Sequence, residues 1–466
     1  MKKILQGLIF ACIFFSSVFS KTYSDKTFLM PRDQITNLPM EYTTWHMNIY
    51  RKADTFYNGT VQVVPFYQKS DNKTDVGKYF GFDRGGTTGI VNQISVGTTA
   101  ANQLLDNRFI LHHYNAANTL DATYKFEPYQ EIFGARLSWN QDLDGILNGL
   151  FFRINTPLVK VKNDMNIKTV GTETNQAIPG VGGQAKSFLD YLSGNIENAS
   201  QHNVQAPLRY AKITNDSQSS SGVADIDLML GYTFWHKSHS RIAINLAMLI
   251  PTGKTPKGSA IFEAIHGNGQ HWGVGAGIDY ALTLWKKIDK SIKFSIVANY
   301  KYLFEGIEKR TLDFKRPDPN NTKASAGYYQ LAGEQGKKGV FPFANVLTQD
   351  IKVTPGSVFD GIANMAFNYK DFVFDIGYNL YAREAENVKL RYLWENDKYA
   401  VAGITYDTNN NFNVLVAAGG APTQAYAYDG APANTNASIN NEHLDFDSIK
   451  TPSQITHKIY GGLGYQ

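Results

Sequence analysis

The sequence predicts an all-β protein, a transmembrane antiparallel up-and-down β-barrel of about 12–14 strands with long extracellular loops. Three observations predict it. Long stretches carry an apolar residue at every second position, the connections between these stretches are short and long in turn, and the chain begins with a leader of the secretory type.

Alternation is the main signal, because a strand places successive side chains on opposite faces. From Trp272 to Leu284 the even positions are apolar or aromatic, while the odd positions hold glycines, Asp279, Ala281 and Thr283. The same pattern recurs at 224–234, 241–250, 292–304, 357–369 and 372–384, and more weakly at 131–140, 147–158 and 454–465. We expect each of these stretches to be a strand with one apolar face.

The length of these stretches favours a membrane barrel over a β-sandwich. They run for about 10–14 residues, whereas strands of globular proteins usually have about 5–6. A tilted strand needs about 9–11 residues to cross a bilayer.

The connections alternate in length. Short ones are expected at 140–146, 236–240, 286–291, 370–371 and 449–453, and long ones at 159–222, 251–271, 305–356 and 385–440. Bacterial outer-membrane barrels have short periplasmic turns and longer extracellular loops. The long loops are expected to be solvated, and 407–441, rich in Asn, Ala, Gly and Thr, is expected to stay mobile.

Aromatic residues flank the short turns, where amphipathic rings favour the level of the lipid headgroups. The expected interface aromatics are Trp139, Trp235, Trp285, Tyr369 and Phe372. A preference of tryptophan for strand ends is the alternative explanation.

Residues 1–20 have the layout of a signal peptide cleaved after Ser20, with Lys2 and Lys3 before an apolar run. A lipoprotein signal with Cys12 as the lipidated residue is the alternative. Cys12 is the only cysteine, so cleavage after Ser20 removes thiol chemistry and cysteine-ligated metals from the mature chain.

The charge of the chain gives no argument for a nucleic-acid partner. Loss of Lys2 and Lys3 lowers the formal net charge from +4 to +2, with 43 basic and 41 acidic residues. The expected partners are outer-membrane lipid, the barrel assembly machinery and a small solute, and no cofactor is expected.

Both ends of the mature chain leave alternatives open. Residues 21–58 are expected to be a periplasmic segment, a plug in the lumen or a first strand, ahead of the barrel at 59–466. The chain ends on Gly464-Tyr465-Gln466, so an aromatic assembly signal is one residue early. Either this signal is imperfect or later strands are missing.

Charged residues are confined to the face opposite the apolar one. A charge facing lipid at mid-depth costs about 2–4 kcal/mol, so these residues are expected to line the lumen: Arg136, Arg153, Asp225, Asp227, Arg241, Asp279, Lys293, Lys301, Asp360, Asp375 and Arg383. They could pair across strands and fill the lumen, or form a pore lining that selects solutes. Six are basic and five acidic, so no preference for one sign of solute charge emerges.

Residues 245–253, which end in Pro-Thr-Gly, are followed by Gly258 and by His271-Trp-Gly-Val-Gly-Ala-Gly277. This pattern, within residues 220–310, resembles the barrel of fatty-acid and aromatic-compound outer-membrane transporters, including the phenol-degradation porins. The resemblance implies a monomeric barrel of about fourteen strands with a plugged or narrow lumen. The plug motif of the fatty-acid transporters is not evident near the mature N-terminus.

We expect a channel or transporter in the outer membrane for small solutes, with hydrophobic solutes included. The alternative is a structural or surface-interaction barrel with a filled lumen, whose long loops bind other cells or envelope parts. No catalytic motif is found, so no enzyme is expected. Glu263 and His266 have a metal-like spacing only on a helix, and they fall in a loop, so no metal site is expected.

Overall fold

The computed structural model describes residues 26–31, 34–43, 59–71, 73–80, 93–97, 105–106, 122–173, 176–177, 185–195, 206–315, 327–334, 341–401, 404–406, 412–414, 425–426, 432–433 and 439–465. The expected signal peptide and most of 407–441, the segment expected to be mobile, lie outside these residues. No helix within the described ranges is long and apolar enough to span a membrane.

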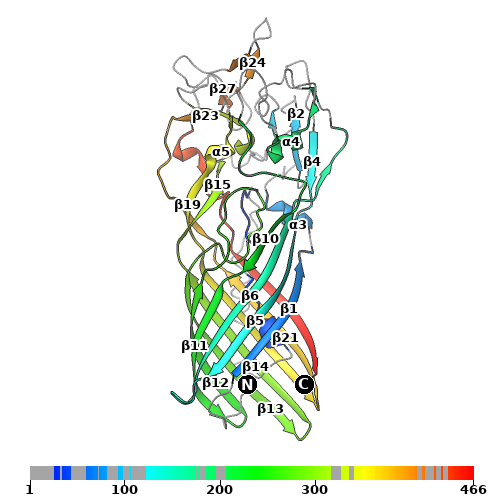
Figure 1. Ribbon diagram of the computed structural model, residues 1–466, viewed down its shortest axis with the longest axis vertical. Coiled ribbons are helices and arrows are strands. Elements are labelled where there is room, and N and C mark those ends of the chain that lie inside the picture. Colours follow the sequence, from blue (N-terminus) through cyan, green and yellow to red (C-terminus); the bar gives the residue numbers. More distant parts are fainter. Residues whose placement is uncertain are drawn as a thin grey trace.

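One large, curled antiparallel sheet makes up the lower half of the molecule (Figure 1). Its neighbours follow the order of the chain: β1 (Gly59–Lys69), β5 (Tyr129–Asp142), β6 (Leu150–Asp164), β11 (Ile226–Lys237), β12 (Ser240–Ile250), β13 (Gly273–Lys287), β14 (Lys290–Leu303), β20 (Gly356–Tyr369), β21 (Phe372–Arg383) and β29 (Gln454–Tyr465). The short β10 (Gln218–Val223) also pairs with β6. The described sheet therefore has fewer strands than the 12–14 expected.

The alternation in the sequence appears directly as alternation in burial. Along β12, for example, the burial of successive residues switches between buried and exposed. Short turns join β11 to β12, β13 to β14 and β20 to β21 at the lower end of the sheet. Residues 449–453 were expected to be another such turn, but they lead from the upper part of the molecule directly into β29. The expectation failed because Leu444 and Asp445 pair with another upper strand and not with the large sheet.

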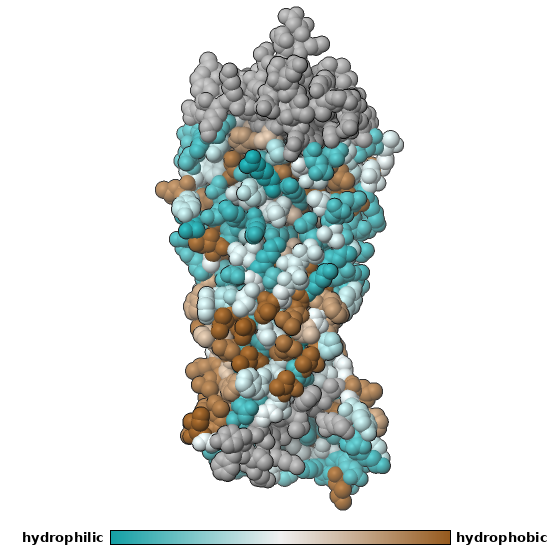
Figure 2. All heavy atoms as spheres, viewed as in Figure 1, coloured by the Kyte–Doolittle hydropathy of each residue, from teal (hydrophilic) through white to brown (hydrophobic). Residues whose placement is uncertain are grey.

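Apolar side chains cover the outer, convex face of the large sheet. On the face shown in Figure 2, hydrophobic residues gather over the lower part of the molecule, and hydrophilic residues dominate above them. Ile278 is 43% exposed on the convex face, whereas its neighbour Asp279 is 1% exposed on the concave face. The convex face of the sheet thus carries apolar side chains, and the concave face carries polar and charged ones.

The connections at the upper end build a second structure, which we call the cap (Figure 1). Its strands are β2 (Gln93–Gly97), β3 (Leu105–Asp106), β4 (Ala122–Phe126), β7 (Ile167–Thr169), β8 (Gln176–Ala177), β9 (Ala185–Lys186), β15 (Gly306–Thr311), β16 (Asp313–Phe314), β17 (Leu331–Glu334), β18 (Phe341–Pro342), β19 (Thr348–Thr354), β22 (Asn387–Leu390), β23 (Tyr399–Val401), β24 (Ile404–Tyr406), β25 (Phe412–Val414), β26 (Ala425–Tyr426), β27 (Pro432–Ala433) and β28 (Leu444–Asp445). Its short helices are α3 (Lys73–Lys78), α4 (Phe188–Ser193), α5 (Ala344–Leu347), η2 (Gly327–Tyr329) and η3 (Asn441–His443).

The cap has a hydrophobic core of its own, so the expectation of solvated loops is wrong for its described parts. Buried residues from connections far apart in the sequence meet there, among them Phe188, Phe262, Tyr329, Ile351 and Leu444. The free energy of burying these apolar side chains favours an ordered cap. The sequence pattern missed it because each connection contributes only a few apolar residues.

Candidate functional site

Part of the N-terminal region lies against the concave face of the large sheet. We call the described residues 26–31 and 34–43 the inner segment; it includes the helix α2 (Leu38–Tyr42). Pro39 occupies the first turn of α2, where its missing N–H costs no helical hydrogen bond. The helix contacts β5, β20 and β21, which lie on different parts of the curled sheet.

Glu41 of α2 is the centre of a buried ion network. Its Oε2 lies 2.8 Å from an Arg136 guanidinium nitrogen, and its Oε1 lies 3.6 Å from Nε of Arg153. Arg153 also reaches Asp279 at 3.0 Å and donates to the Tyr42 hydroxyl at 2.6 Å. All five side chains are nearly inaccessible to solvent. The network therefore links α2 to β5, β6 and β13.

Apolar contacts also hold the inner segment against the concave face of the sheet. Leu38 and Tyr42 pack with Ala281, Val297 and Ile362. Higher up, Ile35 packs with another apolar group, contributed by Leu249, Leu303, Val358 and Tyr381. A cavity beside this segment has a volume of only about 20 Å³, which is room for about one water molecule. Among the described residues, this part of the inner segment therefore packs closely against the concave face.

The upper end of the inner segment is held by the cap and the upper strand ends. Arg383 donates to the carbonyl oxygens of Pro31 and Met30 at 2.8 and 2.9 Å. The backbone N–H of Thr27 donates to the Ser448 carbonyl at 2.9 Å. The segment thus runs from the cap to the middle of the large sheet.

A buried charge cluster lies where the inner segment meets the cap. The Arg310 guanidinium is 3.8 Å from the ring centre of Phe28 and forms ion pairs with Glu308 and Glu386. His271 Nε2 lies 2.8 Å from Glu308. Burial alone would raise the pKa of Glu386, but the charge and hydrogen bonds of Arg310 lower it overall. Glu386 therefore stays ionised beside the N-terminal region.

The other residues predicted to line the lumen lie on the same concave face. Lys301 and Asp227 form an ion pair of 2.5 Å. Asp360 accepts from the Leu38 N–H and from Asn379, and Asp375 accepts from Asn364. Arg241 donates to Thr233, while Lys293 lies at the lower end of the sheet. These residues share the concave face with Arg136, Arg153 and Asp279, which belong to the Glu41 network described above.

Asp225 lies apart from this network and explains the Pro-Thr-Gly motif. Its Oδ1 accepts from the N–H groups of Thr252 and Gly253 at 3.1 Å each, and its Oδ2 accepts from Asn268 at 2.7 Å. Asp225 itself adopts a φ of 66°, a conformation that aspartate tolerates better than most residues. One carboxylate therefore ties the start and the end of the 251–271 connection to β11.

We expect Asp225→Ala to open this connection. Three charge-assisted hydrogen bonds are lost, at a cost of about 3 kcal/mol. Trypsin should then cleave after Lys254 or Lys257 about a hundredfold faster, since cleavage follows the population of the open form. Asp216→Ala is the matched control, because Asp216 is exposed on an earlier part of the chain. Equal cleavage of the two variants would refute this role of Asp225.

Glycines of β13 make room on the concave face. A side chain at Gly275 would collide with Lys301, and one at Gly277 would collide with Asn299 and Asn245. The glycine-rich strand therefore lets polar side chains from β12 and β14 lie close together.

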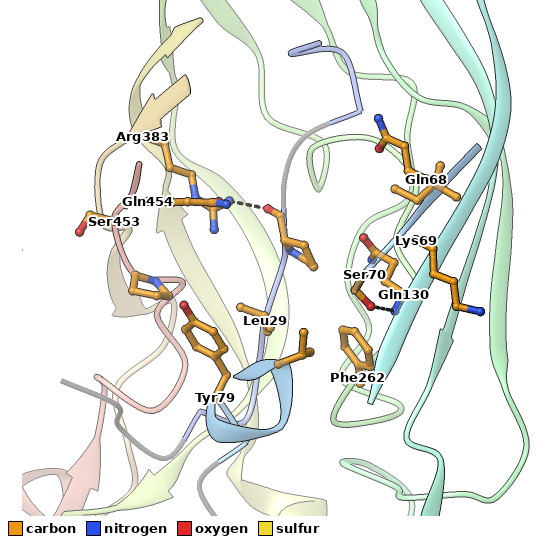
Figure 3. Close-up of a pocket in the computed structure, with 14 residues that line it drawn as sticks. Leu29, Gln68, Lys69, Ser70, Tyr79, Gln130, Phe262, Arg383, Ser453 and Gln454 are labelled. Atoms are coloured by element: carbon orange, nitrogen blue, oxygen red, sulfur yellow. Dashed lines mark hydrogen bonds between the residues drawn. The ribbon is translucent and has the colours of Figure 1, made fainter. Parts of the chain in front are cut away.

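A cavity of about 300 Å³ lies between the two edge strands at the upper end of the sheet. Figure 3 shows Gln68 and Lys69 of β1 on one side and Gln454 of β29 on the other, with Leu29 between them. Most of its lining is apolar, from Leu29, Pro31, Val76, Tyr79, Ile132, Phe262 and Pro452. Such a size and lining suit a small, mostly apolar ligand with a polar end.

The five predicted interface aromatics lie at the lower strand ends with between 40% and 52% of each residue exposed. β-Bulges at Thr233/Trp235 and Thr283/Trp285 shift the register there. Each bulge turns two consecutive residues outward, Phe234 with Trp235 and Leu284 with Trp285. Strict alternation would have turned both tryptophans inward.

Sequence reasoning missed Glu41 and Tyr42, as well as the cluster around Arg310. Glu41 lies in a region without clear periodicity, and its one local signal is the Leu38-Pro39 start of a short helix. Glu263 and His266, which share a metal-like spacing, contact different partners: Glu263 pairs with Lys254, and His266 pairs with Ser220. No protein-family model and no curated protein matches the chain.

Proposed function

We propose that the chain is an outer-membrane barrel whose lumen is blocked by the inner segment and that admits small solutes when this segment moves. The observation that carries this proposal is the seat of α2 on the concave face, where Glu41 joins Arg136 and Arg153. A segment held largely by a few ion pairs and short apolar contacts can leave without unfolding the sheet.

The convex face supports a membrane location. Trp272, directly before β13, and Trp285, near the lower end of β13, are both exposed. Thirteen residues of tilted strand separate them, which corresponds to roughly 30 Å of height. The exposed residues between them on this face are apolar, including Val274 and Ile278. An apolar band between aromatic rows is the surface that a bilayer requires.

Closure of the sheet into a barrel is part of the proposal. β1 and β29 are the edges of the described sheet, yet both line the 300 Å³ cavity (Figure 3). The curl therefore brings the two edges to opposite sides of one cavity. Closure would pair the backbone N–H and C=O groups of β1 and β29 with each other. Unpaired backbone groups are strongly unfavourable in the hydrocarbon core of a bilayer.

The solute class follows from the cavity. Its apolar lining favours a small hydrophobic or amphipathic molecule, in line with the resemblance of residues 220–310 to fatty-acid and aromatic-compound transporters. Leu29 and Pro31 belong to the inner segment, so a ligand in the cavity would contact the element that blocks the lumen.

Tethering the inner segment tests the proposal. Leu38→Cys with Ile362→Cys places two thiols in one packed cluster. In a planar bilayer the reduced variant should show transient openings, and oxidation to the disulfide should abolish them. Liposomes carrying the oxidised variant should also stop taking up octanoate or benzoate.

Leu38→Cys alone is the control, since it has no partner thiol and should not respond to oxidation. Openings that persist after complete oxidation of the pair would show that solutes do not pass where the inner segment lies. The absence of both conductance and uptake in every form would refute transport.

Surface interaction is the second candidate, and the packed cap favours it. Loops can cover a pore without a hydrophobic core of their own. A surface that binds a partner gains affinity when a core such as that of the cap keeps it rigid, because less conformational freedom is lost on binding. Binding of the purified protein to cells or envelope components, without solute uptake, would favour this candidate.

A further inference from the structure

Lysines from two neighbouring turns, with Lys293 from the concave face of β14, surround one hollow at the lower end of the large sheet. The hollow has a volume of about 540 Å³ and lies between the β13–β14 turn and the β20–β21 turn. Its lysines are Lys286, Lys287, Lys290, Lys293 and Lys370. Asp289 and Asp371 are the acidic residues in its lining, so the formal charge of the lining is +3.

These lysines are arranged around exposed aromatic rings. Lys287 lies 5.6 Å from the ring centre of Trp285, and Lys290 lies 4.7 Å from that of Tyr369. Among the described residues, no ion pair joins Lys286, Lys287, Lys290 or Lys370 to a carboxylate. Their charge is therefore left for a group outside the described chain.

The position of the hollow indicates the kind of group. Trp285 and Tyr369 mark the lower end of the apolar band, where headgroups lie next to hydrocarbon. Ile288 at the tip of the turn is fully exposed. A ligand here meets cations and apolar surface together, as a phospholipid does with its phosphate and its acyl chains.

We propose that the four lysines of the two turns at the rim of this hollow, Lys286, Lys287, Lys290 and Lys370, together with Trp285 and Tyr369, bind the headgroup of an anionic phospholipid from the adjoining leaflet. The proposal rests on the membrane location proposed above. Clustered lysines at a bilayer surface attract anionic lipid more strongly than separate ones, because their potentials add.

Other turns provide a contrast within the same protein. The β11–β12 turn has a comparable aromatic residue, Trp235, with Lys237 at 4.2 Å from its ring centre. The β5–β6 turn carries the acidic Asp144. If lysine clustering matters, lipid selectivity should be found at Trp285 and not at Trp235.

Quenching of tryptophan fluorescence by brominated lipid tests the proposal, because it reports the lipid next to one chosen tryptophan. One variant keeps only Trp285, with the other five tryptophans changed to phenylalanine, and a matched variant keeps only Trp235. Each is reconstituted in phosphatidylcholine vesicles containing either brominated phosphatidylglycerol or brominated phosphatidylcholine at equal mole fraction. We expect Trp285 to prefer phosphatidylglycerol by about fivefold or more and Trp235 to show little preference.

Charge removal provides the second arm. Replacing Lys286, Lys287, Lys290 and Lys370 together by glutamine should abolish the preference at Trp285, whereas Lys237→Gln should leave it unchanged. Folding is checked by the heat-dependent gel mobility of the reconstituted protein. A preference that survives the fourfold replacement would overturn the assignment to these lysines.

Three further outcomes separate lipid from soluble anions and from failure of the membrane model. If glycerophosphoglycerol at millimolar concentration removes the preference, the hollow recognises a free phosphate diester and the lipid proposal fails. Equal quenching of Trp285 by both lipids would overturn the headgroup site but support the membrane location. No quenching by either lipid would overturn the membrane location itself.

Discussion

Asp279→Asn is expected to lower the free energy of unfolding by about 3–5 kcal/mol, because it leaves the Arg153 guanidinium buried with less compensation. Asp279 is 1% exposed and lies 3.0 Å from Arg153 across the concave side of the sheet. Urea titration of the protein in detergent micelles or vesicles, followed by tryptophan fluorescence, measures the change.

Asp289→Asn is the matched control, because it makes the same chemical change in an exposed turn and should alter stability by less than about 0.5 kcal/mol. The double variant Arg153→Met with Asp279→Leu should be less destabilised than Asp279→Asn, since no buried charge of the pair is then left alone. A loss below about 1 kcal/mol for Asp279→Asn would mean that water reaches Arg153 freely, which contradicts its burial on the concave side of the sheet.

Glu41→Gln is expected to release the inner segment while the sheet stays folded. Arg136 and Arg153 then lose the carboxylate that joins them to α2, at a cost of about 3 kcal/mol. Such a change corresponds to roughly a hundredfold rise in the population with the segment displaced. In planar bilayers the open probability should rise by a similar factor.

Glu395→Gln controls for the charge change, because Glu395 pairs with Lys398 on the exposed surface of the cap. Its conductance should equal that of the unchanged protein. If Glu41→Gln also conducts as the unchanged protein does, with a normal folded gel mobility, the inner segment is not the barrier to solutes.

Much of the sheet was predictable because strand alternation is a local property. The alternating stretches at 241–250, 292–304 and 372–384 coincide closely with β12, β14 and β21. Each strand shows one face to apolar surroundings, so its sequence carries the period without reference to its neighbours. The charged residues of the opposite face could be located by the same pattern.

The partners of those charges could not be predicted. Asp225 and Asp227 share one face in the sequence pattern, yet Asp225 binds backbone N–H groups of a loop and Asp227 binds Lys301. Which partner a carboxylate meets depends on strand register and on loop paths that no local pattern records. The β-bulges before Trp235 and Trp285 could not be predicted either, because they depend on the register between neighbouring strands.

The sequence by itself determined which stretches form long strands, which face of each is apolar and where the turns between β11 and β12, β13 and β14, and β20 and β21 lie. Only the tertiary structure decided that 34–43 occupies the concave side, that the long connections share a hydrophobic core, and that Glu41 joins two arginines from different strands. Periodicity reports the environment of one element at a time. Contacts between segments far apart in the chain form only when the curl of the sheet brings them together.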